Sequence, residues 1–147
     1  MITKCLTNEP TENYQLERMA GYQKYTDLEV WKQARILASV IYEVTGSYPK
    51  SEQFGIISQM RRCAVSVSSN IARGFGRQHT KETIQFLNIS KGSLYGQETQ
   101  LYISKDLKFI IEEQLNTCHQ QIESLGKLIN GFIRFKNSTI KANKPTN

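Results

Sequence analysis

The sequence predicts an all-α protein, an antiparallel up-down-up-down four-helix bundle. Apolar residues recur at steps of three and four in four separate segments, which is the spacing of one helix face. No proline occurs between Lys50 and Lys144, so nothing interrupts long helices there. The chain has 147 residues, of which 39% are hydrophobic and 22% charged. This is enough to bury one core without disulfides or metal.

The first helix is expected to begin at Thr26. Thr26 followed by Glu29 is typical of a capping box, in which the two side chains satisfy free backbone N–H groups. Gly46 and Pro49 mark its end. Its apolar stripe is formed by Val30, Ala34, Leu37, Ile41 and Val44.

The second helix is expected to begin near Ser51 and to end at Gly74 and Gly76. A short alternating run at residues 65–68 would suit a strand, but it lies inside a longer helical pattern. The apolar stripe of this helix is formed by Ile57, Met60, Ala64, Val67 and Ile71.

The third helix is predicted from Thr80 to Asp106 and carries two ionisable residues on its stripe. The stripe consists of Ile84, Leu87, Lys91, Leu94, Glu98 and Leu101. Buried charges need partners. We therefore expect Lys91 and Glu98 to join Arg61 or Arg62 in a structural polar network.

The fourth helix is predicted to end at Lys136, giving a bundle over residues 25–136. Its stripe is formed by Leu115, Cys118, Ile122, Leu125, Ile129 and Phe132. Residues 1–24 lack periodicity and are expected to form a flexible arm. Residues 137–147 are expected to form a disordered polar tail.

Glycines inside the third helix need an explanation, because glycine costs a helix interior about 1 kcal/mol relative to alanine. A tight helix crossing, with Gly92 opposite Gly126, is the favoured explanation. Close approach of a ligand is the alternative.

The net charge of +6 is concentrated in two blocks without acidic residues. Residues 53–81 contain Arg61, Arg62, Arg73, Arg77 and Lys81, and residues 124–147 contain Lys127, Arg134, Lys136, Lys141 and Lys144. In the predicted topology the second helix ends, the third begins and the fourth ends at one end of the bundle. We call the cations expected there the basic pole: Arg73, Arg77, Lys81, Arg134, Lys136 and Lys141. The simpler interpretation of the basic pole is a solvated basic face, and the more specific interpretation is a surface that binds nucleic acid.

Catalytic and metal-binding patterns are not found in the sequence. Cys5, Cys63 and Cys118 are far apart, and His79 and His119 share no ligand spacing. We therefore expect no metal, no cofactor and no enzymatic activity; an enzyme using Glu98 as a buried acid or base is the remaining alternative. The start of the chain lacks an apolar signal segment, which favours a cytoplasmic protein.

Four blocks of sequence resemble a known family. They are YTDLEVW at residues 25–31, QMRRCAVSVSSNIARGFGR at 59–77, FLNISKGSL at 86–94 followed by ETQL at 98–101, and GKLINGF at 126–132. In this order they are similar to the four-helix-bundle family of 23S rRNA-intervening sequence proteins. The resemblance implies a homopentamer and no known catalysis. Some relatives are accessory proteins of diversity-generating retroelements that bind nucleic acid and a reverse transcriptase.

The chain departs from the family pattern at four positions. Ser68 stands where proline is usual, and Arg73 and Gly96 stand where glutamate is usual. Lys108 stands where glycine is usual, and it is expected to hold an unfavourable left-handed turn conformation.

These observations predict a non-enzymatic, oligomeric scaffold that binds RNA or DNA with little sequence specificity. The residues expected to contact phosphates are Arg61, Arg62, Arg73, Arg77, Lys81 and Arg134. The alternative is a protein-interaction module, such as an accessory subunit that binds a retroelement reverse transcriptase.

Overall fold

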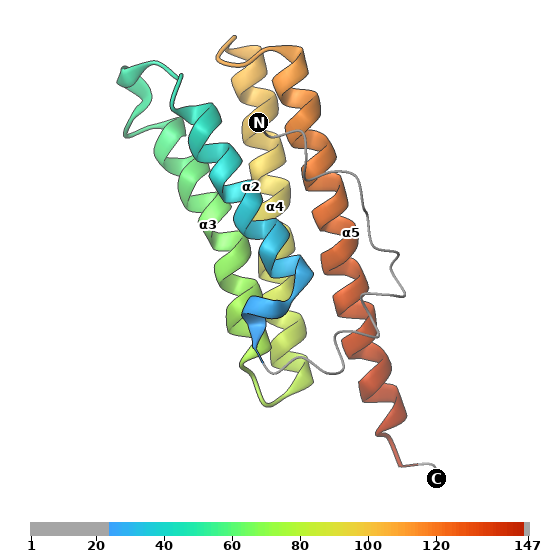
Figure 1. Cartoon of the computed structure of the whole chain (residues 1–147). Coiled ribbons are helices and arrows are strands. Elements are labelled where there is room, and N and C mark those ends of the chain that lie inside the picture. The colour runs from blue at the N-terminus through green and yellow to red at the C-terminus, as the bar shows by residue number, and fades with distance from the viewer. Residues whose placement is uncertain (1–23, 146–147) are drawn as a thin grey trace.

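The computed structural model describes residues 24–145, which form four α-helices and no strand. The helices are α2 (Glu29–Thr45), α3 (Ile56–Phe75), α4 (Thr80–Asp106) and α5 (Glu112–Ala142), with short 3-10 helices η1 (Tyr25–Asp27) and η2 (Lys50–Glu52). In Figure 1, α2 and α4 run upward and α3 and α5 run downward. The predicted all-α four-helix bundle is confirmed. The predicted arm at residues 1–24 lies, except for Lys24, outside the described residues.

The helices form a closed ring in which each packs on two neighbours. The pairs are α2–α3, α3–α4, α4–α5 and α2–α5, and the α3–α4 contact is the most extensive. One hydrophobic core fills the centre of this ring. None of the helices within the described residues is long and apolar enough to cross a membrane.

The start of α2 differs from the prediction. The helix begins at Glu29, and Thr26 lies in η1 without capping it. Leu28 holds the N-cap position and is only 1% exposed. Burying a leucine side chain is worth about 1.5–3 kcal/mol, which exceeds a typical cap of about 1 kcal/mol. The side chain of Glu29 instead accepts a hydrogen bond from Gln33 Nε2 at 2.7 Å.

The second predicted helix, α3, begins at Ile56, after η2 and a turn, rather than near Ser51. Its predicted stripe is buried throughout, and its end at Gly76 agrees with the prediction. In the link before α3, the Glu52 carboxylate accepts a hydrogen bond from the Ile56 N–H at 3.5 Å.

The bounds of α4 are as predicted, but its buried stripe differs from the predicted one. Every second residue of the stripe lies one position earlier in the sequence. The buried residues are Thr83, Leu87, Ser90, Leu94, Gln97, Leu101 and Ser104. The three leucines are common to both stripes, whereas polar residues replace Ile84, Lys91 and Glu98. Thr83 Oγ1 donates to the Gly74 carbonyl at 2.9 Å, and Ser90 Oγ donates to the Val67 carbonyl at 2.7 Å. Small hydroxyl groups can be buried because a helix carbonyl satisfies each one.

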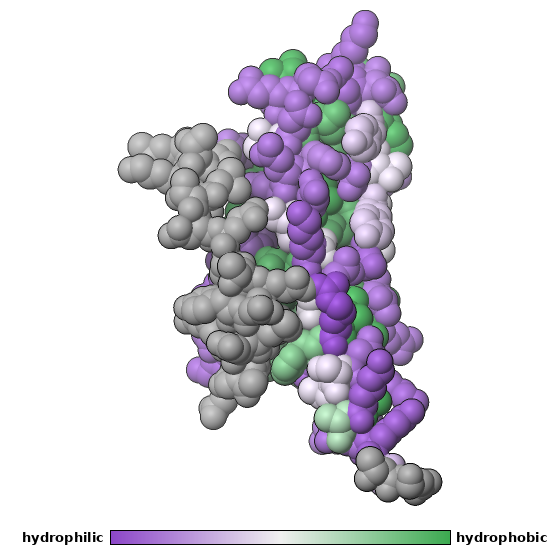
Figure 2. Space-filling model, turned by 90° about the vertical axis from the view of Figure 1, so that its right-hand side faces the viewer, coloured by the Kyte–Doolittle hydropathy of each residue, from purple (hydrophilic) through white to green (hydrophobic). Residues whose placement is uncertain are grey.

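The predicted stripe of α5 is buried as expected. The helix then continues to Ala142, so residues 137–142 are helical and the tail predicted for 137–147 begins too early. Local hydrogen bonds accompany this extension: Ser138 Oγ donates to the Phe135 carbonyl and Thr139 Oγ1 to the Lys136 carbonyl. Figure 2 shows that the surface on the α5 side is largely hydrophilic, with hydrophobic residues visible between the polar ones.

The tight helix crossing lies at Gly74, not at Gly92. A Cβ added at Gly92 would have no atom within 4 Å, and one at Gly126 would lie 3.7 Å from Leu94 Cδ2. A Cβ at Gly74 would lie 3.1 Å from both the Thr83 carbonyl oxygen and Phe86 Cβ. Gly74 therefore allows the end of α3 to approach the start of α4.

The turn between α4 and α5 contains the expected strain. Lys108 has a φ of 62°, in the left-handed region that favours glycine. The Lys108 N–H donates to the Lys105 carbonyl and the Phe109 N–H to the Ser104 carbonyl, which closes the end of α4.

Candidate nucleic-acid interface

The end of the bundle that is lowest in Figure 1 gathers the end of α3, the start of α4 and the end of α5. Side-chain contacts give the register of these helices. Gly74 lies beside Thr83, and Gly126 lies beside Leu94. In an antiparallel pair, each step back along one helix corresponds to a step forward along the other, at about 1.5 Å per residue. Arg73 of α3 therefore lies level with about residue 84 of α4, and Lys81 of α4 lies level with about residue 139 of α5. The basic pole therefore occupies one end of the molecule.

The side chains of the basic pole are mostly exposed. Arg73, Arg77, Lys81, Arg134 and Lys141 are exposed, and Lys136 is half-buried. Two of them lie over aromatic rings: Arg77 Cζ is 4.6 Å from the centroid of Phe86, and Lys136 Nζ is 5.8 Å from that of Phe132. Such contacts favour particular positions for the cations without neutralising them.

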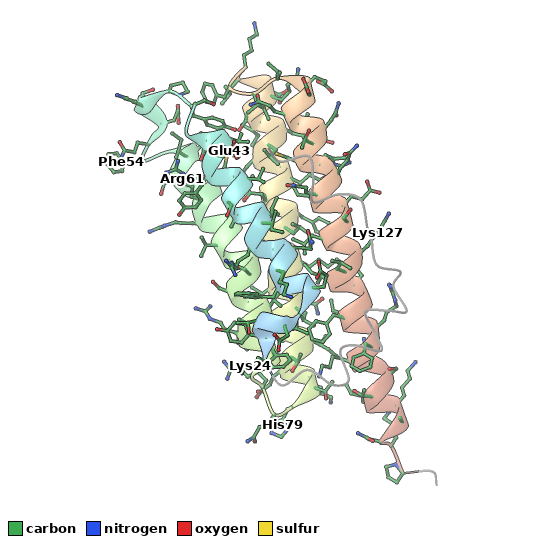
Figure 3. All side chains as sticks on the ribbon, in the orientation of Figure 1. Lys24, Glu43, Phe54, Arg61, His79 and Lys127 are labelled. Carbon is green, nitrogen blue, oxygen red and sulfur yellow. The ribbon has the colours of Figure 1, made fainter. Side chains whose placement is uncertain are left out.

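One cation at this end was not part of the prediction. Figure 3 shows Lys24 at the same end of the bundle as His79, which directly precedes α4. The sequence could have indicated its position, because Lys24 directly precedes η1 and α2 begins at this end of the bundle. Three exposed or half-buried acids, Asp27, Glu29 and Glu82, lie in the first turns of η1, α2 and α4 and reduce the local charge. Basic side chains still outnumber them.

Two predicted phosphate contacts, Arg61 and Arg62, lie elsewhere. Figure 3 shows Arg61 near Phe54 and Glu43, at the opposite end from His79. Arg61 and Arg73 are separated by about 18 Å along α3 at 1.5 Å per residue. Arg61 and Arg62 are therefore not part of the basic pole.

Arg61 has a structural role that the sequence did not reveal. Its Nε donates to Thr45 Oγ1 at 3.0 Å and its Nη2 donates to the Tyr42 carbonyl at 3.3 Å. Its guanidinium carbon is 4.6 Å from the centre of the Tyr42 ring. Arg61 thus links α3 to the last turn of α2, where the Tyr42 carbonyl also accepts from the Gly46 N–H at 3.1 Å.

The predicted network of Lys91 and Glu98 with Arg61 or Arg62 is wrong. Glu98 Oε1 lies 3.6 Å from His119 Nδ1 on α5, and Lys91 Nζ lies 5.8 Å from the centre of the Tyr95 ring. Because the buried stripe of α4 lies one position earlier, both side chains are at its margin and remain partly exposed. The clue in the sequence is the seven-residue repeat of uncharged polar residues at positions 83, 90, 97 and 104.

Comparison with family models gives a match. The model of the 23S rRNA-intervening sequence protein matches residues 26–131. The chain belongs to this family. The match runs from η1 through α2, α3 and α4 to Gly131 in α5. A comparison with curated protein sequences gives no match.

Part of the basic pole lies inside the matched region of this 23S rRNA-intervening sequence protein, and part lies beyond it. Arg73, Arg77 and Lys81 are inside, whereas the pole residues of α5 from Arg134 onward are outside. The extension of α5 to Ala142 carries these last cations on a helix rather than on a tail.

The two described thiols of this family member are held protonated by their surroundings. Burial raises the pKa of Cys118 to about 11. Burial also raises the pKa of Cys63, whose Sγ donates to the Ser93 carbonyl at 2.9 Å. Neither thiol has the lowered pKa of a reactive cysteine. Within residues 24–145, no three side chains of the His, Cys, Asp and Glu types gather as metal ligands would.

Proposed function

We propose that this protein is a non-enzymatic, oligomeric scaffold that binds RNA or DNA through its basic pole. The observation that supports the proposal is the convergence of exposed cations from α3, α4 and α5 on one end of the bundle. Clustered lysine and arginine side chains on one surface create a positive potential that attracts a polyanion.

The proposed binding is electrostatic and largely independent of sequence. Lysine and arginine at the pole would contact phosphates, which carry no sequence information. Each phosphate neutralised contributes about −0.7 to −0.9 to the slope of log affinity against log salt. Five contacts per protomer therefore correspond to a slope of about −3.5 to −4.5.

The outer face of α4 supports the oligomeric part of the proposal. Ile89, Tyr95, Tyr102 and Ile103 are each 44–51% exposed. The buried side of the same helix carries three leucines that alternate with Thr83, Ser90, Gln97 and Ser104. A surface helix normally places apolar residues inward and polar residues outward. A second copy covering the outer face would explain why apolar side chains lie on the outer side of α4 as well, and a pentamer is the assembly that the family resemblance implies.

An oligomer would strengthen binding at each pole. Linked copies present several modest phosphate sites to one nucleic acid, so the second and later contacts form at high effective concentration. The proposed scaffold therefore needs neither a deep pocket nor base-specific contacts.

Binding is tested by fluorescence anisotropy of labelled RNA and DNA with purified, nucleic-acid-free protein. The test variant is Arg73→Ala/Arg77→Ala/Lys81→Ala. The control, Lys105→Ala/Lys108→Gly/Lys127→Ala, removes the same charge away from the pole. We expect the test variant to weaken binding at least tenfold more than the control. Equal losses would refute the assignment to the pole.

A protein-only function predicts a different result. If the pole faces an acidic protein surface, such as that of a reverse transcriptase, the wild-type protein will bind neither RNA nor DNA at low salt. This outcome would refute nucleic-acid binding and leave the basic pole as a protein contact.

Assembly is tested by light scattering coupled to size-exclusion chromatography. Ile89→Glu/Ile103→Glu places two charges on the outer face of α4. Ile111→Glu is the control, because Ile111 is 61% exposed and precedes α5. We expect the double variant alone to reduce the measured mass toward that of one chain. An unchanged mass would exclude this face as the contact between copies.

A further inference from the structure

Arg77 and Phe86 form a distinctive pair within the basic pole. The Arg77 guanidinium carbon lies 4.6 Å from the centre of the Phe86 ring. Arg77 is exposed and Phe86 is half-buried, so the ring supports the guanidinium group from the protein side. No hydrogen bond or ion pair engages the Arg77 side chain in the part of the chain that the structure describes.

The local backbone builds this pair. Because Gly74 has no side chain, the start of α4 approaches α3 closely enough that a Cβ at Gly74 would lie 3.1 Å from Phe86 Cβ. The Arg77 N–H donates to the Gly74 carbonyl at 3.3 Å, which fixes the backbone of Arg77 just after the end of α3. The same carbonyl accepts the buried hydroxyl of Thr83 at 2.9 Å. Arg77 is thus held over Phe86 from both helices.

A supported guanidinium group can make two contacts at once, the first of which a lysine cannot make. Its plane can stack on a nucleobase, and its N–H edge can donate to a phosphate. The contact with Phe86 restricts the side chain before any ligand arrives, which lowers the entropy lost on binding. Lys81 and Arg73, which are exposed nearby, supply charge for the adjoining phosphates.

We infer that the basic pole takes single-stranded nucleic acid, with an unpaired base stacked on the Arg77–Phe86 pair. This inference rests on the proposed function, because it names the class of nucleic acid for the same site. Bases in a duplex are stacked on each other and offer only their edges, whereas an unpaired base has a free face. Stacking is tolerant of base identity, in agreement with binding that is largely independent of sequence.

The test compares three fluorescein-labelled probes of about a dozen nucleotides, measured by anisotropy with the full chain. The first is single-stranded oligothymidylate, the second is the same strand in a duplex, and the third is an abasic strand of the same length and charge. The variants are Arg77→Lys, which keeps the charge and removes the plane, and Phe86→Leu, which removes the support. Arg73→Lys is the matched control, and circular dichroism verifies that each variant is folded.

For the wild-type protein we expect oligothymidylate to bind at least about fivefold more tightly than the abasic strand, the lower end of the range for base stacking. Arg77→Lys and Phe86→Leu should reduce this ratio toward one. Arg73→Lys should preserve it, and the slope with salt should be the same for both lysine variants. Affinity for the duplex should be insensitive to Arg77→Lys.

Equal wild-type affinity for oligothymidylate and the abasic strand would overturn the inference and leave the proposed function standing. Equal loss of the ratio in Arg73→Lys and Arg77→Lys would also overturn it, because the effect would then belong to any guanidinium group of the basic pole and not to the Arg77–Phe86 pair. Failure of the wild-type protein to bind any probe would overturn both the inference and the proposed function.

Discussion

Two buried glycines that contact α4 predict opposite responses to the same substitution. A Cβ at Gly126 would lie 3.7 Å from Leu94 Cδ2, an ordinary contact. A Cβ at Gly74 would lie 3.1 Å from the Thr83 carbonyl oxygen and from Phe86 Cβ. Both residues are helical and buried, so Gly74→Ala and Gly126→Ala differ mainly in the space available for one methyl group.

The magnitudes follow from this geometry. Alanine favours a helix interior over glycine by about 0.5–1 kcal/mol, and Gly126→Ala should stabilise the fold by that amount. At Gly74 the methyl group meets backbone, so α3 and α4 must separate, and overpacking of this kind costs about 1–3 kcal/mol. Separation also strains the hydrogen bond from Thr83 to the Gly74 carbonyl, which is worth about 1 kcal/mol. Gly74→Ala should therefore destabilise the fold by about 1–3 kcal/mol.

Urea unfolding followed by far-ultraviolet circular dichroism measures both effects. The midpoint should rise for Gly126→Ala and fall for Gly74→Ala, while the m-value of each variant stays that of the wild type. A Gly74→Ala variant as stable as the wild type would refute the close approach of α3 and α4. It would also mean that Gly74 does not bring Phe86 close to the end of α3.

Four further predictions concern stability and thiol chemistry. Ser90→Ala should lower the free energy of unfolding by about 1 kcal/mol, because Ser90 Oγ donates to the Val67 carbonyl at 2.7 Å; an unchanged urea midpoint would contradict this. Lys108→Gly should raise it by about 1 kcal/mol, because it relieves a φ of 62°; lower thermal stability would count against that reasoning. Cys118 should be alkylated only on global unfolding, whereas half-buried Cys63 should react faster, and peptide mass spectrometry that finds Cys118 modified first would disprove this. Because the folded state keeps the Cys118 thiol protonated to about pH 11 and the unfolded chain releases that proton near 9.0, its contribution to stability should be lost as the pH rises through this window.

The four-helix bundle could be predicted because each helix has a regular apolar stripe and short links. The stripes of α3 and α5 are buried as predicted, since their core positions are apolar residues that periodicity detects. The stripe of α4 was predicted one position off. Its core alternates leucine with Thr83, Ser90, Gln97 and Ser104, and hydropathy alone favours the neighbouring Ile84 over buried Thr83. Tertiary hydrogen bonds to α3 decide that choice, and these cannot be seen in one segment.

The start of α2 was less predictable for a related reason. A capping motif competes with the burial of nearby side chains, and at the start of α2 the burial of Leu28 prevails over the capping box of Thr26. The end of α5 was missed because its polar residues interrupt the apolar pattern while their hydroxyls bond within the helix.

For the candidate site, topology was more informative than any motif. The acid-free blocks of sequence and the alternating helix directions together predicted that the cations of the basic pole lie at one end, and the helix bounds and register agree. Arg61 could not be assigned in this way. Its hydrogen bonds to Thr45 and to the Tyr42 carbonyl depend on where α2 ends relative to α3. The Arg77–Phe86 pair likewise depends on the close approach at Gly74.

The salt dependence of nucleic-acid affinity tests the central claim most directly. Anisotropy titrations of the wild-type protein should give a slope of log affinity against log salt of about −3.5 to −4.5 per protomer engaged. Removing Arg73, Arg77 and Lys81 should reduce the magnitude of that slope by about 2–3, at roughly one phosphate each. A wild-type slope near zero, or a slope unchanged in the triple variant, would contradict binding through the basic pole.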